Sequence, residues 1–226
     1  MLRFPILLTN DDGINSPGLQ HLASSLHSLG HPIAILAPLT EQSAVGMKLT
    51  LRDDMAFEEH TDIAEKIRTD ESAPLRVFSL DGSPCDCVIV AIDGGLRSLA
   101  PEIRPWLCIS GINRGPNLSI DVLHSGTVSA AREASLYGLP SLSVSLATYS
   151  HQDYSQSIEA TLALVERLSH LVTAEPSNML RPEGSRMRPI RGTGTNSLRS
   201  WFTQGNMFLN LNIPENWNGT FQTVPL

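Results

Sequence analysis

Short apolar runs alternate with amphipathic stretches along most of this chain. Residues 4–9 form an apolar run that ends abruptly at Asn10-Asp11-Asp12-Gly13, the pattern of a buried parallel strand followed by a turn. The next residues, Ser16-Pro17, have the N-cap and first-turn signals of a helix, and leucines follow at helical spacing up to Gly30. A second apolar run at residues 32–37 completes a predicted βαβ unit.

The rest of the pattern predicts an α/β fold with one departure from strict alternation. Residues 49–57 and 75–80 have strand character with no helix predicted between them, which indicates an antiparallel excursion. Further helices are predicted from Ser83-Pro84 to Leu99 and over residues 128–137 and 155–171, and further strands over residues 106–110, 141–146 and 207–213. We therefore expect a Rossmann-like three-layer sandwich with a mostly parallel central sheet and a small antiparallel excursion.

Residues 173–205 lack apolar periodicity and are rich in proline, glycine and arginine. This composition predicts a long mobile insertion loop at the surface. The length of 226 residues fits one large α/β domain, so we expect residues 1–226 to form a single domain.

Composition excludes several classes of partner and site. The net charge of −7 and a pI of about 5.4 argue against binding to a nucleic-acid polymer or an anionic membrane. No apolar run is long enough to cross a bilayer and the N-terminus lacks a signal-peptide pattern, so we expect a cytoplasmic protein. The cysteines, with no CxxC spacing, are interpreted as reduced and mostly buried, and a zinc site is not expected.

Polar residues follow successive strands of the predicted sheet: Asp11 and Asp12, then Ser43, then Asn113. If the strands are parallel, these residues converge at the carboxyl edge, where α/β sheets bind ligands. Adjacent carboxylates repel each other and resist desolvation unless a cation holds them. Carboxylate, hydroxyl and amide oxygens suit Mg²⁺, Mn²⁺ or Ca²⁺, which is the arrangement for metal-assisted hydrolysis.

A helix start at Ser125-Gly126-Thr127 offers free N–H groups and hydroxyls, which bind phosphate well. Each of these motifs also has a purely structural interpretation. The acid pair can be a polar turn, Ser43 a turn serine, Asn113 an Asx-turn residue, and the Ser-Gly-Thr run an ordinary N-cap.

The motifs together resemble the SurE (survival protein E) 5'/3'-nucleotidase family. The resemblance rests on Leu8-Thr9-Asn10-Asp11-Asp12-Gly13, Gly82-Ser83-Pro84-Cys85-Asp86, Ser110-Gly111-Ile112-Asn113-Arg114-Gly115-Pro116-Asn117 and Ser125-Gly126-Thr127-Val128. It implies one Mg²⁺ or Mn²⁺ per subunit held by Asp11, Asp12, Ser43 and Asn113. It also implies hydrolysis of nucleoside 5'-monophosphates, with 3'-monophosphates as a further candidate class, and phosphate binding by Asn117, Ser125, Gly126 and Thr127.

The chain also departs from that family. Gln42-Ser43-Ala44 stands where the family commonly has Arg-Ser-Gly, and His124 stands where tyrosine is common. Family members continue past the last strand into an extended hairpin and a helix that exchange between subunits, and this C-terminal arm is not expected here. A homodimer or higher homo-oligomer is the family expectation, and the short tail leaves a catalytically weak or inactive metal- and nucleotide-binding protein as the alternative.

The mechanism expected from these residues is metal-assisted hydrolysis in which Asp11, Asp12 and Asn113 are catalytic. Asp12 would position or deprotonate the attacking water, and a covalent aspartyl-phosphate on Asp11 stays open. A receiver-type signalling domain is discounted because Ser110 and Ser145 lie at the strand ends where such a domain needs an aspartate. The preferred nucleotide is not indicated by any residue in the variable stretches 53–73 or 173–205.

Overall fold

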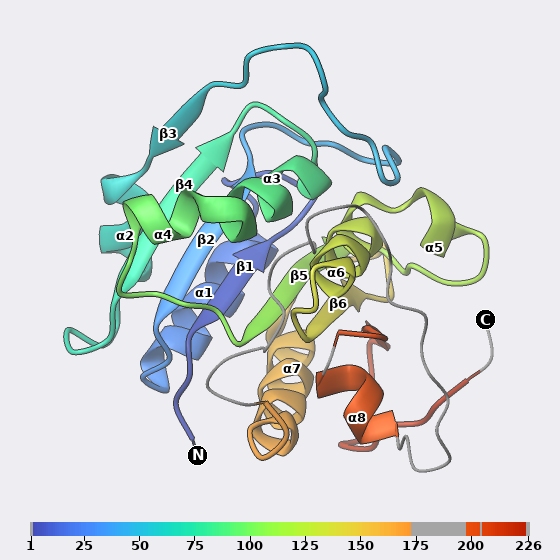
Figure 1. Cartoon of the computed structure of the whole chain (residues 1–226). Coiled ribbons are helices and arrows are strands. Elements are labelled where there is room, and N and C mark those ends of the chain that lie inside the picture. Colours follow the sequence, from blue (N-terminus) through green and yellow to red (C-terminus); the bar gives the residue numbers. More distant parts are fainter. Residues whose placement is uncertain (1, 173–197, 204, 225–226) are drawn as a thin grey trace.

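The computed structural model describes residues 2–172, 198–203 and 205–224, and it contains a seven-stranded sheet. The strand order is β3-β4-β2-β1-β5-β6-β7 (Figure 1). The adjacent strands pair in parallel except β3 with β4, which pair antiparallel. In chain order the strands are β1 (Ile6–Thr9), β2 (Ile33–Pro38), β3 (Phe57–Glu59), β4 (Leu75–Leu80), β5 (Leu107–Arg114), β6 (Ser141–Leu146) and β7 (Leu209–Ile213).

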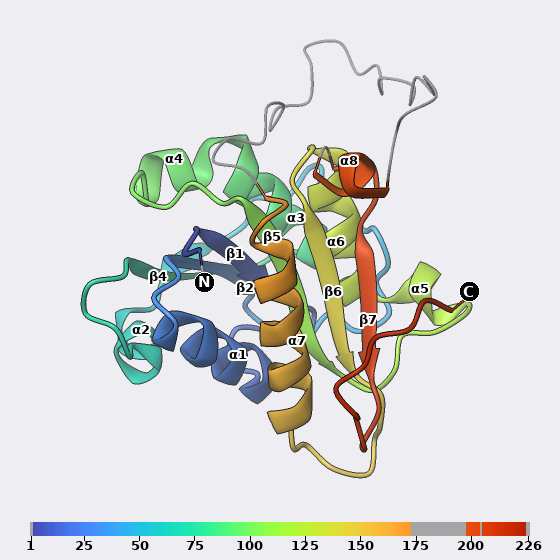
Figure 2. The same ribbon diagram turned by 90° about the horizontal axis from the view of Figure 1, so that it is seen from below.

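Helices cover both faces of this sheet, which confirms the predicted Rossmann-like α/β sandwich (Figures 1 and 2). One core cluster joins the sheet to α1 (Pro17–Ser28), α2 (Thr61–Ile67) and α7 (Ser155–Leu168). The other joins it to α3 (Pro84–Val90), α4 (Leu96–Leu99) and α6 (Gly126–Leu136). Two further short helices are α5 (Asp121–His124), before α6, and α8 (Leu198–Thr203), before β7.

The central strands are apolar throughout because both of their faces are buried. In β1, Ile6 and Leu8 point into the core beneath α1, and Leu7 points into the core beneath α3. Side chains of successive strand residues alternate between faces, so a continuous apolar run fills both layers at once. On the second face, Ala130 and Ala134 of α6 are fully buried, as the small-residue pattern of this helix predicted.

The predicted excursion between residues 49 and 80 is partly confirmed. The antiparallel pairing is present, with Phe57 opposite Leu80, and β4 lies in the main sheet beside β2. The predicted strand over residues 49–57 is wrong, since only Phe57–Glu59 is extended, and α2 lies between the two strands. This helix has only seven residues, with Ile63, Ala64 and Ile67 buried, which is too short to give a clear helical period.

Several element bounds differ from the prediction by a few residues, and two of the differences change the structure near the site. The helix that begins at Pro84 is interrupted by a π-helical turn, Ala91–Gly95, in which Gly94 has φ +108°. Strand β5 continues to Arg114 instead of ending at Ser110, so Asn113 lies in the strand and not in a loop. Gly111 permits this continuation because its φ is +143° and a Cβ there would clash with the carbonyl oxygen of Val144 in β6.

Most of the predicted mobile loop, residues 173–197 and 204, lies outside the described residues. The part that is described contradicts a loop, because residues 198–203 form α8 and Phe202 packs in the core. Within the described part of the chain, none of the helices combines the length and apolar character needed to span a bilayer.

Candidate functional site

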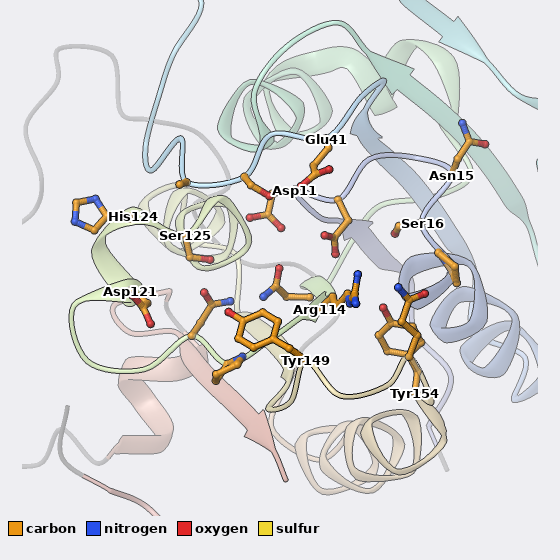
Figure 3. Close-up of a pocket in the computed structure, with 18 residues that line it drawn as sticks. Asp11, Asn15, Ser16, Glu41, Arg114, Asp121, His124, Ser125, Tyr149 and Tyr154 are labelled. Atoms are coloured by element: carbon orange, nitrogen blue, oxygen red, sulfur yellow. Dashed lines mark hydrogen bonds between the residues drawn. The ribbon is translucent and has the colours of Figure 1, made fainter. Parts of the chain in front are cut away.

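The carboxyl ends of β1, β2, β5 and β6 surround a cavity of about 660 Å³. Strand β1 lies between β2 and β5, so the strands that follow β1 in the chain lie on both sides of it. The strand order therefore reverses at β1. Open α/β sheets bind ligands at the carboxyl end of such a switch point. Figure 3 shows the side chains that converge there from different elements. Six of the eight predicted site residues line this cavity, namely Asp11, Asp12, Ser43, Asn113, Asn117 and Ser125.

Asp11 is held by the first turn of α6. Its side chain is buried, with 4% exposed, and its Oδ2 accepts a hydrogen bond from the backbone N–H of Thr127 at 2.9 Å. The Thr127 hydroxyl donates to the other carboxylate oxygen. Gly126 must lack a side chain here, because a Cβ would lie 2.7 Å from the Cβ of Asp11. Gly126 and Thr127, both predicted to bind phosphate, therefore lie behind Asp11 and do not line the cavity.

The surroundings raise the pKa of both carboxyl groups. Burial raises the pKa of Asp11, and the hydrogen bonds from Thr127 oppose this rise. Burial, together with the neighbouring charge of Asp11, raises the pKa of Asp12 to about 7, although the backbone N–H of Arg114 opposes it. Glu41 adds a further negative charge near Asp12. The site is therefore built to favour a cation or a proton beside this pair.

The remaining predicted ligands offer oxygen atoms to the same cavity. The Nδ2 group of Asn113 donates to the carbonyl oxygen of Gly115 at 2.9 Å, which leaves its Oδ1 as the acceptor end. Ser43 donates its hydroxyl to Oε1 of Glu41 at 2.7 Å and keeps its oxygen lone pairs. No group of three or more His, Cys, Asp or Glu side chains suited to a metal occurs among the described residues. A cation at this site would therefore need the serine and asparagine oxygens as well as the carboxylates.

Asn117 and Ser125 differ in how many of their hydrogen-bonding groups are paired within the protein. Asn117 donates from Nδ2 to the Ser145 hydroxyl at 2.9 Å and from its backbone N–H to Oδ1 of Asn212 at 2.8 Å. It is therefore tied to β6 and β7 at the edge of the cavity. Ser125 is the N-cap of α6, where its hydroxyl oxygen accepts from the N–H of Val128 at 3.1 Å. The Ser125 hydroxyl proton stays available to a ligand.

Sequence reasoning missed several side chains that line the cavity. Arg114 is exposed, follows Asn113 at the end of β5, and is the only arginine or lysine among the described residues lining the cavity. Arg114 is part of the glycine-rich motif, and a positive side chain directly after the predicted metal ligand Asn113 could have indicated an anion-binding residue. Tyr149 and Tyr154 come from the segment between β6 and α7, and no motif surrounds them.

All three cysteines are free and buried, as predicted. Burial raises the pKa of the Cys108 thiol to about 12. Cys108 lies within β5 and is fully buried, so it takes no part in the cavity.

Comparison with known proteins identifies the family. The model of the family described as survival protein SurE matches residues 6–225. A protein named 5'-nucleotidase SurE from Syntrophotalea carbinolica is 42% identical over 192 residues, which cover 83% of this chain and 69% of that protein. A protein of the same name from Synechococcus elongatus is 41% identical over 165 residues, covering 73% of this chain and 59% of that protein.

A solved structure leads to the same family. The crystal structure of the SurE protein from Aquifex aeolicus is similar with a TM-score of 0.64 and 27% identity, covering 93% of this chain and 66% of that one. The chain thus spans about six to seven tenths of the length of the relatives it matches. Because the family model matches nearly the whole chain and the similarity includes the strand ends that form the cavity, this chain belongs to the SurE family.

Proposed function

We propose that this protein is a divalent-metal-dependent phosphatase that hydrolyses nucleoside 5'-monophosphates to nucleoside and phosphate. The names of its relatives support the reaction class. The observation that carries the proposal is the pair of desolvated carboxyl groups, Asp11 and Asp12, at the switch point of the sheet beside the exposed guanidinium of Arg114. Desolvated carboxylates are stabilised by a bound cation, and the neighbouring guanidinium can bind an anionic phosphate. This combination suits phosphoryl chemistry.

The residues fit a hard divalent ion. Asp11, Asp12, Ser43 and Asn113 would hold it, since each offers an oxygen donor to the same cavity and the acid pair is destabilised without a positive charge. Mg²⁺ or Mn²⁺ is the expected ion, because the donor set has no imidazole or thiolate. When bound, such an ion supplies Lewis-acid polarisation of a phosphoryl oxygen.

The chain itself would bind the substrate and move the proton. The Arg114 guanidinium and the Ser125 hydroxyl would hold the phosphate, because both line the cavity and have donors to offer. Asp12 would take the proton from the attacking water, since it is less buried than Asp11 and its carboxylate is not held by α6. Asp11, fixed by Thr127, would stay ionised and anchor the site.

The test is phosphate release from 5'-AMP in Mn²⁺ or in EDTA, by the wild type, Asp12→Asn and Asp54→Asn. Asp54 provides a matched control because it is also the second of two adjacent aspartates, but it is exposed and does not line the cavity. We expect release that needs metal, a loss of about 100-fold or more in Asp12→Asn, and wild-type rates in Asp54→Asn. Release that persists in EDTA or in Asp12→Asn would overturn the proposal, and 3'-AMP assayed alongside decides the second substrate class.

A folded protein that binds Mn²⁺ and 5'-AMP in calorimetry but releases no phosphate would instead identify a binding protein. That outcome would support the inactive alternative and contradict the proposed turnover.

A further inference from the structure

An exposed aromatic ring lines the cavity. Tyr149 follows β6, and although it lines the cavity it is 67% exposed. Tyr154, the other tyrosine of the lining, is 4% exposed and offers no free ring face. Figure 3 shows the Tyr149 ring on the opposite side of the group from Asp11 and Glu41. The acidic side chains of Asp11 and Glu41 therefore lie across the cavity from the Tyr149 ring.

The ring of Tyr149 packs closely on the backbone of Gly115. Tyr149 packs against Gly115, where an added Cβ would overlap the ring and come within 2.6 Å of the Tyr149 hydroxyl oxygen. Gly115 has φ +106°, a conformation that favours glycine, and its N–H donates to the carbonyl oxygen of Leu146 at 3.0 Å. The Cε1–Cζ edge and the hydroxyl end of the ring therefore lie against the backbone that directly follows Asn113 and Arg114. The ring is therefore placed beside the strand end that carries two of the residues lining the cavity.

The loop that carries Tyr149 is also held from its other side. The hydroxyl groups of Thr148 and Ser150 both donate to the Glu215 carboxylate, which follows β7. The backbone N–H of Thr148 donates to the carbonyl oxygen of Leu146, and that of Ala147 donates to Ile213, each at 2.8 Å. The residues on both sides of Tyr149 are thus anchored to the sheet. The ring is presented on a fixed support instead of on a free loop.

An exposed ring on an anchored loop, beside a candidate site for a phosphate, is an arrangement that can stack a planar group. From this juxtaposition we propose that Tyr149 is the nucleobase platform of the site, the ring on which the base of the substrate stacks. The site then binds nucleotides more tightly than phosphate monoesters that lack a base. This inference rests on the proposed nucleotide hydrolysis. Because the ring reads the π-face of a base and not its hydrogen-bonding edge, the platform accepts every base and favours purines by their larger stacking area.

The test compares two substrates that share the phosphate and the sugar but differ in the base, 5'-AMP and ribose 5-phosphate. Wild type, Tyr149→Ala and Tyr149→Phe are assayed for KM and kcat with Mn²⁺. In Tyr149→Ala we expect KM for 5'-AMP to rise by about 5- to 150-fold, the range found for removal of one base–aromatic stack. KM for ribose 5-phosphate should not change. Tyr149→Phe keeps the ring and should behave as the wild type.

The outcomes separate this inference from the proposed function. Equal effects of Tyr149→Ala on both substrates, or no effect on 5'-AMP, would overturn the platform while phosphate release upholds the phosphatase. If the wild type releases phosphate from neither substrate, the phosphatase proposal fails, and calorimetric affinities for the same two compounds decide the platform. Tighter binding of 5'-AMP that is lost in Tyr149→Ala would then support it, and equal affinities would overturn it.

Discussion

The contact between Thr127 and Asp11 provides a sharp test of how the site is built. Thr127→Val keeps the shape of a fully buried side chain and replaces the hydroxyl that donates to the Asp11 carboxylate with a methyl group. A hydrogen bond to a charged group contributes about 1.5–3 kcal/mol. Loss of a group that orients a metal ligand typically costs about 10- to 100-fold in metal affinity or turnover. We therefore expect a loss of this size in Mn²⁺ affinity or in phosphate release.

The matched control is Thr127→Ser, which keeps the hydroxyl and loses only a methyl group. Its unfolding free energy should fall by about 1 kcal/mol, while its Mn²⁺ affinity by calorimetry stays at the wild-type level. Urea unfolding in EDTA gives a second readout. Because the hydroxyl bonds most strongly to ionised Asp11, and burial raises the pKa of Asp11, the deficit of the valine variant should grow as the pH rises. Wild-type affinity and turnover in Thr127→Val, or equal losses in both variants, would refute the reasoning.

The remaining predictions concern the same site and the core. Gly126→Ala forces a Cβ to within 2.7 Å of the Cβ of Asp11, and overpacking of this kind costs about 1–3 kcal/mol. The melting temperature and the rate of phosphate release should both fall. Unchanged values of both would contradict the packing. The pKa of Asp12 rises from 3.8 to about 7 on folding, so the native state binds more protons than the unfolded state between these values and stability in EDTA falls as pH rises through them. Asp12→Asn should flatten this pH dependence and stabilise the metal-free protein at pH 8 by up to about 4 kcal/mol, measured by urea unfolding; an unchanged slope would contradict it. The three cysteines are buried, so a thiol reagent such as Ellman's should label none of them before the protein unfolds: Cys85, Cys87 and Cys108. Rapid labelling of the native protein would contradict their burial.

The parts of the fold that the sequence predicts well are those whose pattern is long or sharply ended. The run of residues 6–9 is apolar on both faces and stops at two acids, so both its burial and its carboxyl end are marked. Helix α2 is too short to show a period, and only its packing against the core reveals it. Strand β5 passes through Gly111, which signals a turn in sequence but here allows a close approach to Val144. The meaning of that glycine depends on a neighbour far away in the chain.

The site shows the same division. Parallel strands bring Asp11, Asp12, Ser43 and Asn113 to one edge, as a rule about sheet topology predicts. The direction of each donor is not a property of spacing. The N–H and hydroxyl of Thr127 point to Asp11 and not into the cavity, because Gly126 brings α6 close to β1. Tyr149 becomes part of the site only through its packing on Gly115, which no motif records.

The most direct measurement of the central claim is a metal titration of activity. Protein stripped with EDTA and then dialysed is given increasing Mn²⁺ while phosphate release from 5'-AMP is followed. The account predicts no release from the stripped protein, recovery that saturates at one ion per chain, and no recovery in Asp12→Asn. Full release before any metal is added, or recovery that is the same in Asp12→Asn, would contradict it.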